Sequence, residues 1–217
     1  MVHVMASNIT KSVKPSAILK GLGILNRALK SATFEEAKLL ESHQMSKEQY
    51  PIGPFKKPSS YTEADLRNWM SDLQKLPALL EAEVKGLDDD DLETPYRDGG
   101  WTIRQVINHI ADSHVNMYLR IRQALTQNNP SIIAYDQDSW AMLIDAEDGP
   151  IEPSIKIIDG IHSRTLYLLD SLRHGEFERT YYHPEYDKTY KIWEVVALYA
   201  WHSNHHLAHV KMAKKKI

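Results

Sequence analysis

Cysteine is absent from this chain of 217 residues. Its absence excludes a disulfide framework and any metal site built on thiolates, and it fits a reducing, cytoplasmic compartment. No stretch approaches the roughly 18 consecutive apolar residues of a membrane-spanning helix, so we expect no stable membrane insertion. The net charge of −3 lacks the strong basic footprint of nucleic-acid-binding proteins, so we expect no nucleic-acid partner.

Acidic residues are missing from the first 34 residues, and the rest of the chain holds 21 basic and all 29 acidic residues. The stretch 18–29 has a weak basic amphipathic pattern, which leaves an organellar transit segment as the minor alternative to a cytoplasmic location. We predict a poorly ordered or weakly helical extension over residues 1–48 and one helical domain over residues 49–217. The basic residues of the extension are Lys11, Lys14, Lys20, Arg27 and Lys30.

A loop rich in proline, glycine and serine is expected over residues 50–61. A helical pattern follows, with Thr62 as a plausible N-cap and Asp65 in its first turn. Pro77 lies inside this pattern and predicts a kink. We interpret the acidic run 88–91 that ends it as a solvated turn. The apolar residues at helical spacing are Leu66, Trp69, Leu73, Leu76, Leu80, Val84 and Leu87.

Three further helical patterns follow. The second begins at a capping box of Thr102 and Gln105 and stops at residues 128–130. A short connecting helix is expected near 135–144, the third helix begins near Pro153, and the fourth runs from about 192 to 213. Residues 180–190 are compatible with a small hairpin, but the strand signal is too thin for a larger sheet. The sequence therefore predicts an all-α fold, a four-helix bundle with a long crossover connection.

Histidine is the outlier of the composition, with eleven residues that cluster toward the C-terminal half. His202 and His206 are four residues apart in the fourth helix and therefore point to the same face. That face continues the apolar stripe formed by Val195, Leu198 and Tyr199. A single histidine on such a stripe is usually a hydrogen-bonded core residue, but several together need a shared partner, because unpaired buried polar groups are costly. The pattern predicts that His202 and His206 bind a divalent metal ion.

A third ligand has to come from another helix. His109 flanks the apolar stripe of the second helix, and His162 lies near Ile158 and Ile161 of the third. Spacing alone makes these two histidines comparable candidates.

A family resemblance bears on this choice. The segments YPIGPF, TPYRDGGWTIRQVINHIADSH, YHPE and LYAWHSNHHLAH, in this order, resemble the YfiT-type branch of the DinB-like superfamily over about residues 50–212. The resemblance implies a homodimer and a metal at the base of a pocket, held by His109, His202 and His206. Members are described as metal-dependent hydrolases. Related proteins are thiol S-transferases that use bacillithiol, mycothiol or glutathione.

Three neutral imidazoles leave open positions on a metal ion, which is the arrangement of a catalytic site. We expect one divalent ion per subunit, zinc first and nickel as the alternative, because imidazole suits both. The open position serves either a water whose pKa falls toward ~7 or a thiol that loses its proton. We therefore predict a metal-dependent hydrolase of a small-molecule substrate. The alternatives are a transferase of a low-molecular-weight thiol and a non-catalytic dimeric bundle stabilised by metal.

Two further residues are assigned roles near the metal. His183, in the connection before the fourth helix, is the candidate proton shuttle. Asp112, about one turn after His109, either accepts from the second N–H group of that ligand or simply faces solvent.

Overall fold

The computed structural model describes residues 47–217 of the chain. The predicted extension over residues 1–48 lies almost entirely outside this range. None of the described helices is long and apolar enough to cross a membrane.

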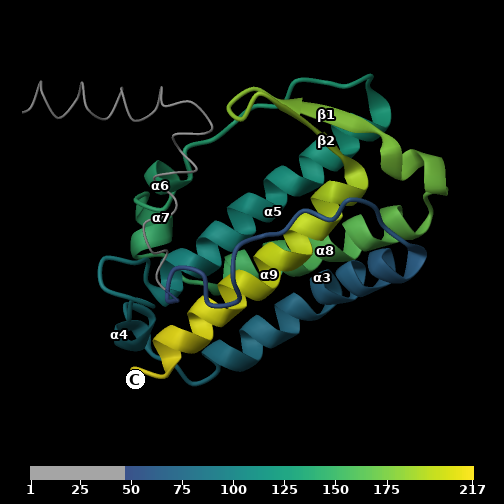
Figure 1. Cartoon of the computed structure of the whole chain (residues 1–217). Coiled ribbons are helices and arrows are strands. Elements are labelled where there is room, and N and C mark those ends of the chain that lie inside the picture. The colour runs from purple at the N-terminus through teal and green to yellow at the C-terminus, as the bar shows by residue number, and fades with distance from the viewer. Residues whose placement is uncertain (1–46) are drawn as a thin grey trace, which may run out of the picture. The chain divides into compact units, whose positions relative to one another are not determined.

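Four long helices form the bundle that the sequence predicts (Figure 1): α3 (Glu63–Val84), α5 (Ile103–Thr126), α8 (Glu152–Asp170) and α9 (Ile192–Lys214). Helix α3 packs against α8 and α9, and α5 packs against the same two helices. The consecutive long helices α3 and α5 therefore lie across the diagonal of the bundle, as do α8 and α9. This arrangement places α5 directly beside α9, which brings their histidines together.

The helix starts follow from local sequence. The hydroxyl oxygen of Thr62 accepts from the Asp65 backbone N–H, and the Asp65 carboxylate accepts from the Thr62 backbone N–H. Thr102 and Gln105 form the same reciprocal capping box at the start of α5. Such boxes satisfy N–H groups that the first turn of a helix leaves unpaired. Helix α3 continues through Pro77 to Val84.

The connections differ from the prediction in detail. The acidic run forms a short helix, α4 (Asp89–Leu92), because Asp88 caps it through a box with Asp91. The single connecting helix expected near 135–144 is instead two, α6 (Gln137–Trp140) and α7 (Ile144–Glu147). After the 3₁₀ helix η1 (His174–Glu178), strands β1 (Thr180–His183) and β2 (Lys188–Lys191) form the antiparallel hairpin. The hairpin lies at the end of the bundle away from α4 and the C-terminus (Figure 1).

The apolar core consists of two clusters. One cluster takes its α5 residues from the range 103–111 and its α9 residues from 207–213. The other takes its α5 residues from 117–124 and its α9 residues from 192–199. The buried polar residues of these helices include His114, His206 and His209. A polar layer of imidazoles therefore lies near the boundary between two apolar halves of the bundle.

Candidate metal centre

His109, His202 and His206 come together where α5 meets α9. One ligand atom from each ring lies within 4.8 Å of the others. The Nε2 atoms of His109 and His202 face each other at 3.2 Å. His109 and His206 are buried, whereas His202 keeps part of its surface open. The structure therefore groups the two histidines of α9 with His109.

Burial keeps these three rings neutral. It lowers the pKa of His109 to about 4, with a further contribution from the charge of His209. Burial also lowers the pKa of His202 and of His206 well below the usual value, and neighbouring histidines add to the effect. A neutral imidazole has a lone pair on one nitrogen, which is the form that binds metal.

The donor set and its geometry fit a divalent transition metal. Ligand nitrogens of a tetrahedral zinc ion lie about 3.4 Å apart when the Zn–N bonds are about 2.0–2.1 Å. The separation of 3.2 Å between the Nε2 atoms of His109 and His202 is close to that value. Two lone pairs at this distance repel each other unless a proton or a cation lies between them. A bound cation removes this conflict for both rings at once.

A pocket of about 500 Å³ opens onto the three histidines. Arg97 and Asp138 provide charged groups in its wall, and Trp101 and Trp201 provide aromatic surface. Gly100 lets the chain turn tightly at the rim, because a Cβ atom there would lie 2.7 Å from Cγ of Arg97. The remaining lining residues are Gln49, Tyr50, Tyr96, Gly99, Gln137, His205 and His209.

His162, the other candidate for the third ligand, is not part of this group. It is buried, and its Nε2 atom lies 2.6 Å from Nδ1 of His114. His114 in turn places Nε2 3.1 Å from Nδ1 of His202. Sequence reasoning gave His114 no role. The sequence shows only that His114 follows His109 by five residues in the same helix. That spacing does not show which residues its ring contacts.

A second group of histidines adjoins the first. His205, His206 and His209 also offer ligand atoms within 4.8 Å of one another. The ring of His205 stacks on Trp201, with centroids 4.5 Å apart, and the ring of His209 stacks on Tyr96 at 3.9 Å. His206 belongs to both groups, and its Nδ1 atom lies 3.3 Å from Nδ1 of His209.

His183 lies at the end of β1, and its ring contacts those of Tyr186 and Tyr190. Burial, with a smaller contribution from the charge of Arg120, lowers its pKa to about 4. Its Nδ1 atom is buried and has no hydrogen-bond partner within residues 47–217. The pocket at the three histidines is lined by other residues, so the structure does not bring His183 together with them.

Asp112 does not appear as a hydrogen-bond partner of His109 in the described structure. Burial raises its pKa to about 6, and the charge of Asp145 contributes in the same direction. Its surroundings therefore disfavour the carboxylate form. Within residues 47–217, His109, His202 and His206 make their side-chain hydrogen bonds with other imidazoles.

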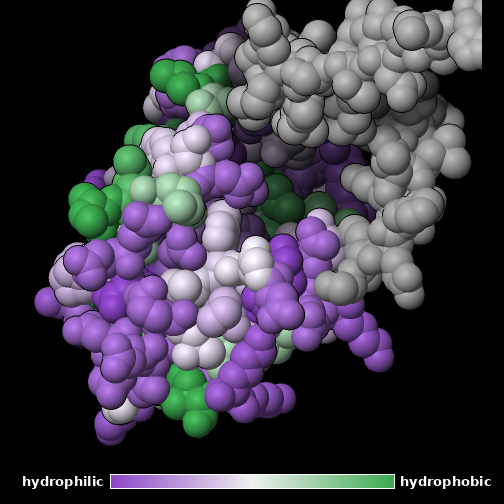
Figure 2. All heavy atoms as spheres, turned by 90° about the vertical axis from the view of Figure 1, so that its left-hand side faces the viewer, coloured by the Kyte–Doolittle hydropathy of each residue, from purple (hydrophilic) through white to green (hydrophobic). Residues whose placement is uncertain are grey.

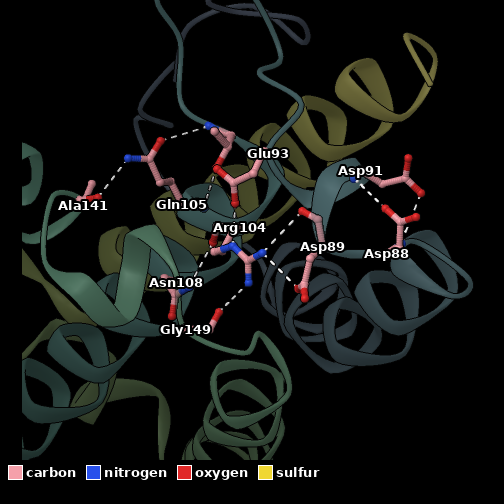
Figure 3. A network of polar contacts seen from close by, with 10 residues as sticks. Asp88, Asp89, Asp91, Glu93, Arg104, Gln105, Asn108, Ala141 and Gly149 are labelled. Atoms are coloured by element: carbon pink, nitrogen blue, oxygen red, sulfur yellow. Dashed lines mark hydrogen bonds and ion pairs between the residues drawn. The ribbon is translucent and has the colours of Figure 1, made fainter.

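A buried arginine, Arg104, holds the start of α5 (Figure 3). The Arg104 guanidinium donates to the Glu93 carboxylate at 2.7 Å, to the Gly149 carbonyl at 2.7 Å and to the Asp89 carboxylate at 3.1 Å. Gln105 reaches the Ala141 carbonyl at 3.0 Å. These bonds tie α4 and the segments before α7 and α8 to the first turn of α5. They thereby hold the helix that carries His109.

The fold and the histidine site identify the family. The model of the DinB superfamily matches residues 72–210, and the chain belongs to this superfamily. Its fold resembles the solved structure of YfiT from Bacillus subtilis, described as a probable metal-dependent hydrolase with an unusual four-helix bundle topology. The TM-score is 0.76 at 37% identity, and the match covers 79% of this chain and 98% of YfiT.

Two relatives are named as putative metal-dependent hydrolases. The protein from Bacillus licheniformis is 41% identical over 173 residues, which cover 80% of this chain and 98% of the relative. The protein from Halalkalibacterium halodurans is 42% identical over 165 residues, which cover 76% of this chain and 95% of the relative. The chain is thus a YfiT-like member of the superfamily, similar over most of its length to proteins named for metal-dependent hydrolysis.

Proposed function

We propose that the protein is a metal-dependent hydrolase and that His109, His202 and His206 hold its metal ion. The observation that carries this proposal is the meeting of three neutral imidazoles at a pocket, with ligand atoms within 4.8 Å of one another. The names of the relatives from Bacillus licheniformis and Halalkalibacterium halodurans support the same reaction class.

The three side chains contribute neutral nitrogen donors, so the charge of the ion is not cancelled by its ligands. A bound zinc or nickel ion would lower the pKa of a water in its open position toward about 7 and so supply a nucleophile at neutral pH. The partial exposure of His202 keeps the site open toward the pocket. Trp101 and Trp201 offer apolar surface to the substrate, and Arg97 offers a positive charge to an anionic group on it.

The ligand assignment is tested by metal analysis of the purified full-length protein. We expect close to one equivalent of metal per chain, mostly zinc with nickel as the alternative. The variants His109→Ala, His202→Ala and His206→Ala are each expected to lose this metal. His174→Ala, which removes an exposed histidine near Tyr61, is the matched control and is expected to keep the metal. Full metal retention in the three ligand variants would refute the assignment.

The reaction is tested on the metal-loaded protein with a panel of esters and amides. We expect hydrolysis of at least one substrate and its loss on chelation. Low-molecular-weight thiols with a reactive electrophile are assayed in parallel, since conjugation without hydrolysis would establish the alternative transferase.

Azide added to a cobalt-substituted sample tests whether the metal ion has an open coordination position. An unchanged cobalt spectrum would favour the non-catalytic bundle.

The role of His183 as a proton shuttle stays a prediction with its own test. His183→Gln is expected to lower kcat and alter the pH profile of kcat while leaving the metal content unchanged. An unchanged kcat would leave its ring a structural part of the hairpin, where it contacts Tyr186 and Tyr190.

We also propose a homodimer. Several large apolar side chains are exposed around α6 and α7, among them Met142, Leu143 and Ile144. Figure 2 shows hydrophobic groups on the face at this end of the molecule, separated by hydrophilic side chains. Light scattering coupled to gel filtration is expected to give twice the chain mass of 25.0 kDa. A monomer at all concentrations would contradict this proposal.

A further inference from the structure

Three hydrogen bonds connect the metal centre to the backbone of α3. Nδ1 of His202 lies 3.1 Å from Nε2 of His114, and Nδ1 of His114 lies 2.6 Å from Nε2 of His162. Nδ1 of His162 lies 2.7 Å from the carbonyl oxygen of Leu73. His114 and His162 are buried, and neither is in the group that offers ligand atoms with His109.

The carbonyl at the end of this chain fixes the direction of every bond in it. A carbonyl oxygen only accepts, so the hydrogen between Leu73 and His162 belongs to Nδ1 of His162. In a neutral ring the other nitrogen then accepts, so Nε2 of His162 accepts from Nδ1 of His114. By the same step, Nε2 of His114 accepts from Nδ1 of His202. The lone pair of His202 is therefore on Nε2, the atom that faces His109.

The Leu73 carbonyl is available for a specific reason. In an α-helix the carbonyl of residue i accepts from the N–H group of residue i+4. The residue four positions after Leu73 is Pro77, which has no N–H group to donate. The Nδ1–H group of His162 takes the place of the missing donor. Pro77 thus creates the acceptor on which the chain of imidazoles ends.

A second, shorter chain serves His206. Nδ1 of His206 lies 3.3 Å from Nδ1 of His209, and Nε2 of His209 lies 3.3 Å from the carbonyl oxygen of Gln49. The same reasoning makes Nε2 of His209 a donor and Nδ1 of His206 a donor. Nε2 of His206 then has the lone pair. These bonds are longer than those of the first chain, so we expect their effect to be smaller.

We propose that His114 and His162 are positioning residues that hold His202 in the tautomer able to bind metal through Nε2, and that His209 does the same for His206. The second nitrogen of a metal-binding imidazole generally donates to a partner that fixes its tautomer and orientation. In this protein the partners are further imidazoles, and each chain ends on a backbone carbonyl. The inference rests on the proposed function only in placing a metal ion at His109, His202 and His206.

This assignment also accounts for the second histidine group. Both nitrogens of His209 are engaged, one by Gln49 and one by His206, and Nδ1 of His206 is engaged by His209. The ring nitrogens that His206 and His209 would offer to a second ion are therefore already engaged, and we infer that these two residues support the first metal and form no second site with His205. The expected metal content is one ion per chain, and two tightly bound ions would overturn this part of the proposal.

The tautomers are measured directly in the full-length protein after removal of metal. Long-range proton–nitrogen correlation spectra of a nitrogen-15-labelled sample distinguish a protonated Nδ1 from a protonated Nε2. We expect His202, His114 and His162 all to carry the proton on Nδ1 at neutral pH. A His202 ring found mainly with the proton on Nε2 overturns the proposal, whatever any variant does.

The effect on metal binding is measured by titration of Co²⁺ against variants of His114. His114→Phe removes the acceptor, and we expect its cobalt affinity to fall by about 10- to 100-fold, the usual effect of losing such a partner. His114→Gln places an amide oxygen where Nε2 was and is expected to recover most of the affinity. His174→Phe, the same substitution on the surface, is the control. Unchanged affinity in a folded His114→Phe overturns the proposal.

Two readouts separate a positioning role from a purely structural one. A structural role predicts that His114→Phe lowers the free energy of unfolding while the His202 tautomer and the cobalt affinity stay as they were. Failure of the proposed hydrolase function has a different signature, since the tautomers and the affinity pattern would persist in a protein that hydrolyses nothing.

Discussion

Acidification is expected to unfold the metal-free protein steeply, because the bundle buries many histidines in their neutral form. Burial is the first cause of a lowered pKa in eight of them, and for five the value is about 4. The five are His109, His162, His183, His205 and His209. In the other three, His114, His202 and His206, burial holds the pKa well below its usual value.

The sign follows from proton linkage. An unfolded histidine has a pKa of about 6.5, so between about pH 6.5 and pH 4 the unfolded chain binds protons that the native chain does not. The free energy of unfolding therefore falls as the pH falls, by up to about 1.4 kcal/mol per pH unit for each histidine. Between pH 7 and pH 5.5 one such histidine loses about 1.2 kcal/mol of stabilisation.

Eight independent histidines would together remove about 10 kcal/mol over that interval. This figure is an upper limit, because neighbouring rings titrate together and because solvent screens His183, His205 and His209 more than the other five. The whole stability of a domain is typically about 5–15 kcal/mol. We therefore expect the metal-free protein to unfold at about pH 5–6, above the ordinary carboxyl pKa values of about 4. Bound metal should raise the stability at neutral pH and be released on acidification, because protons compete for the ligands.

The assay is urea unfolding of metal-free protein, followed by circular dichroism at several pH values between about 7.5 and 5.5. The slope of the unfolding free energy against pH counts the protons taken up on unfolding. His162→Gln should reduce the slope, and His174→Gln, a change at an exposed position, is the comparison. A wild-type slope equal to that of one histidine or less, about 1.4 kcal/mol per pH unit, would refute the reasoning.

Three substitutions test the surroundings of the site, each by urea unfolding. Arg104→Met should lower the free energy of unfolding by about 2 kcal/mol. Breaking a fully buried ion pair would cost more, but Glu93 and Asp89 stay open to water. The raised pKa of Asp112 means that ionisation of its carboxyl group destabilises the fold. Asp112→Asn should therefore stabilise the protein at pH 7 by about 1–2 kcal/mol, a value reduced for the partial exposure of the side chain, and by less at pH 6. Thr102→Ala should cost about 1 kcal/mol and increase amide exchange in the first turn of α5.

The parts of the fold set by local sequence were predictable. The caps at Thr62 and Thr102 depend on residues three positions apart, so the pattern contains all the information needed. The apolar period likewise predicted four helices and the face of α9 that carries His202. The acidic run was less predictable, because Asp88 and Asp91 serve equally well in a solvated turn and in the capping box of a short helix.

The roles of His109 and His162 were not predictable from spacing. Both lie on inward faces, and the period of a helix says which residues are buried but not which helices are neighbours. The packing of α5 directly against α9 gives His109 its place beside His202, whereas His162 of α8 reaches His202 only through His114. Position around the bundle thus separates a candidate ligand from a candidate positioning residue.

Pro77 and His162 show why residues read singly give an incomplete account. A proline inside a helix removes a backbone bond and costs about 3 kcal/mol, and a buried polar ring is costly without a partner. The free carbonyl of Leu73 and the Nδ1–H group of His162 satisfy each other at 2.7 Å, so each defect offsets the other. Pro77→Ala would restore the helical donor, and the Leu73 carbonyl, which has two lone pairs, would then be shared. Sharing the carbonyl weakens the bond that anchors His162. We therefore expect Pro77→Ala to weaken cobalt binding even though it improves the helix, which the sequence of α3 alone does not predict.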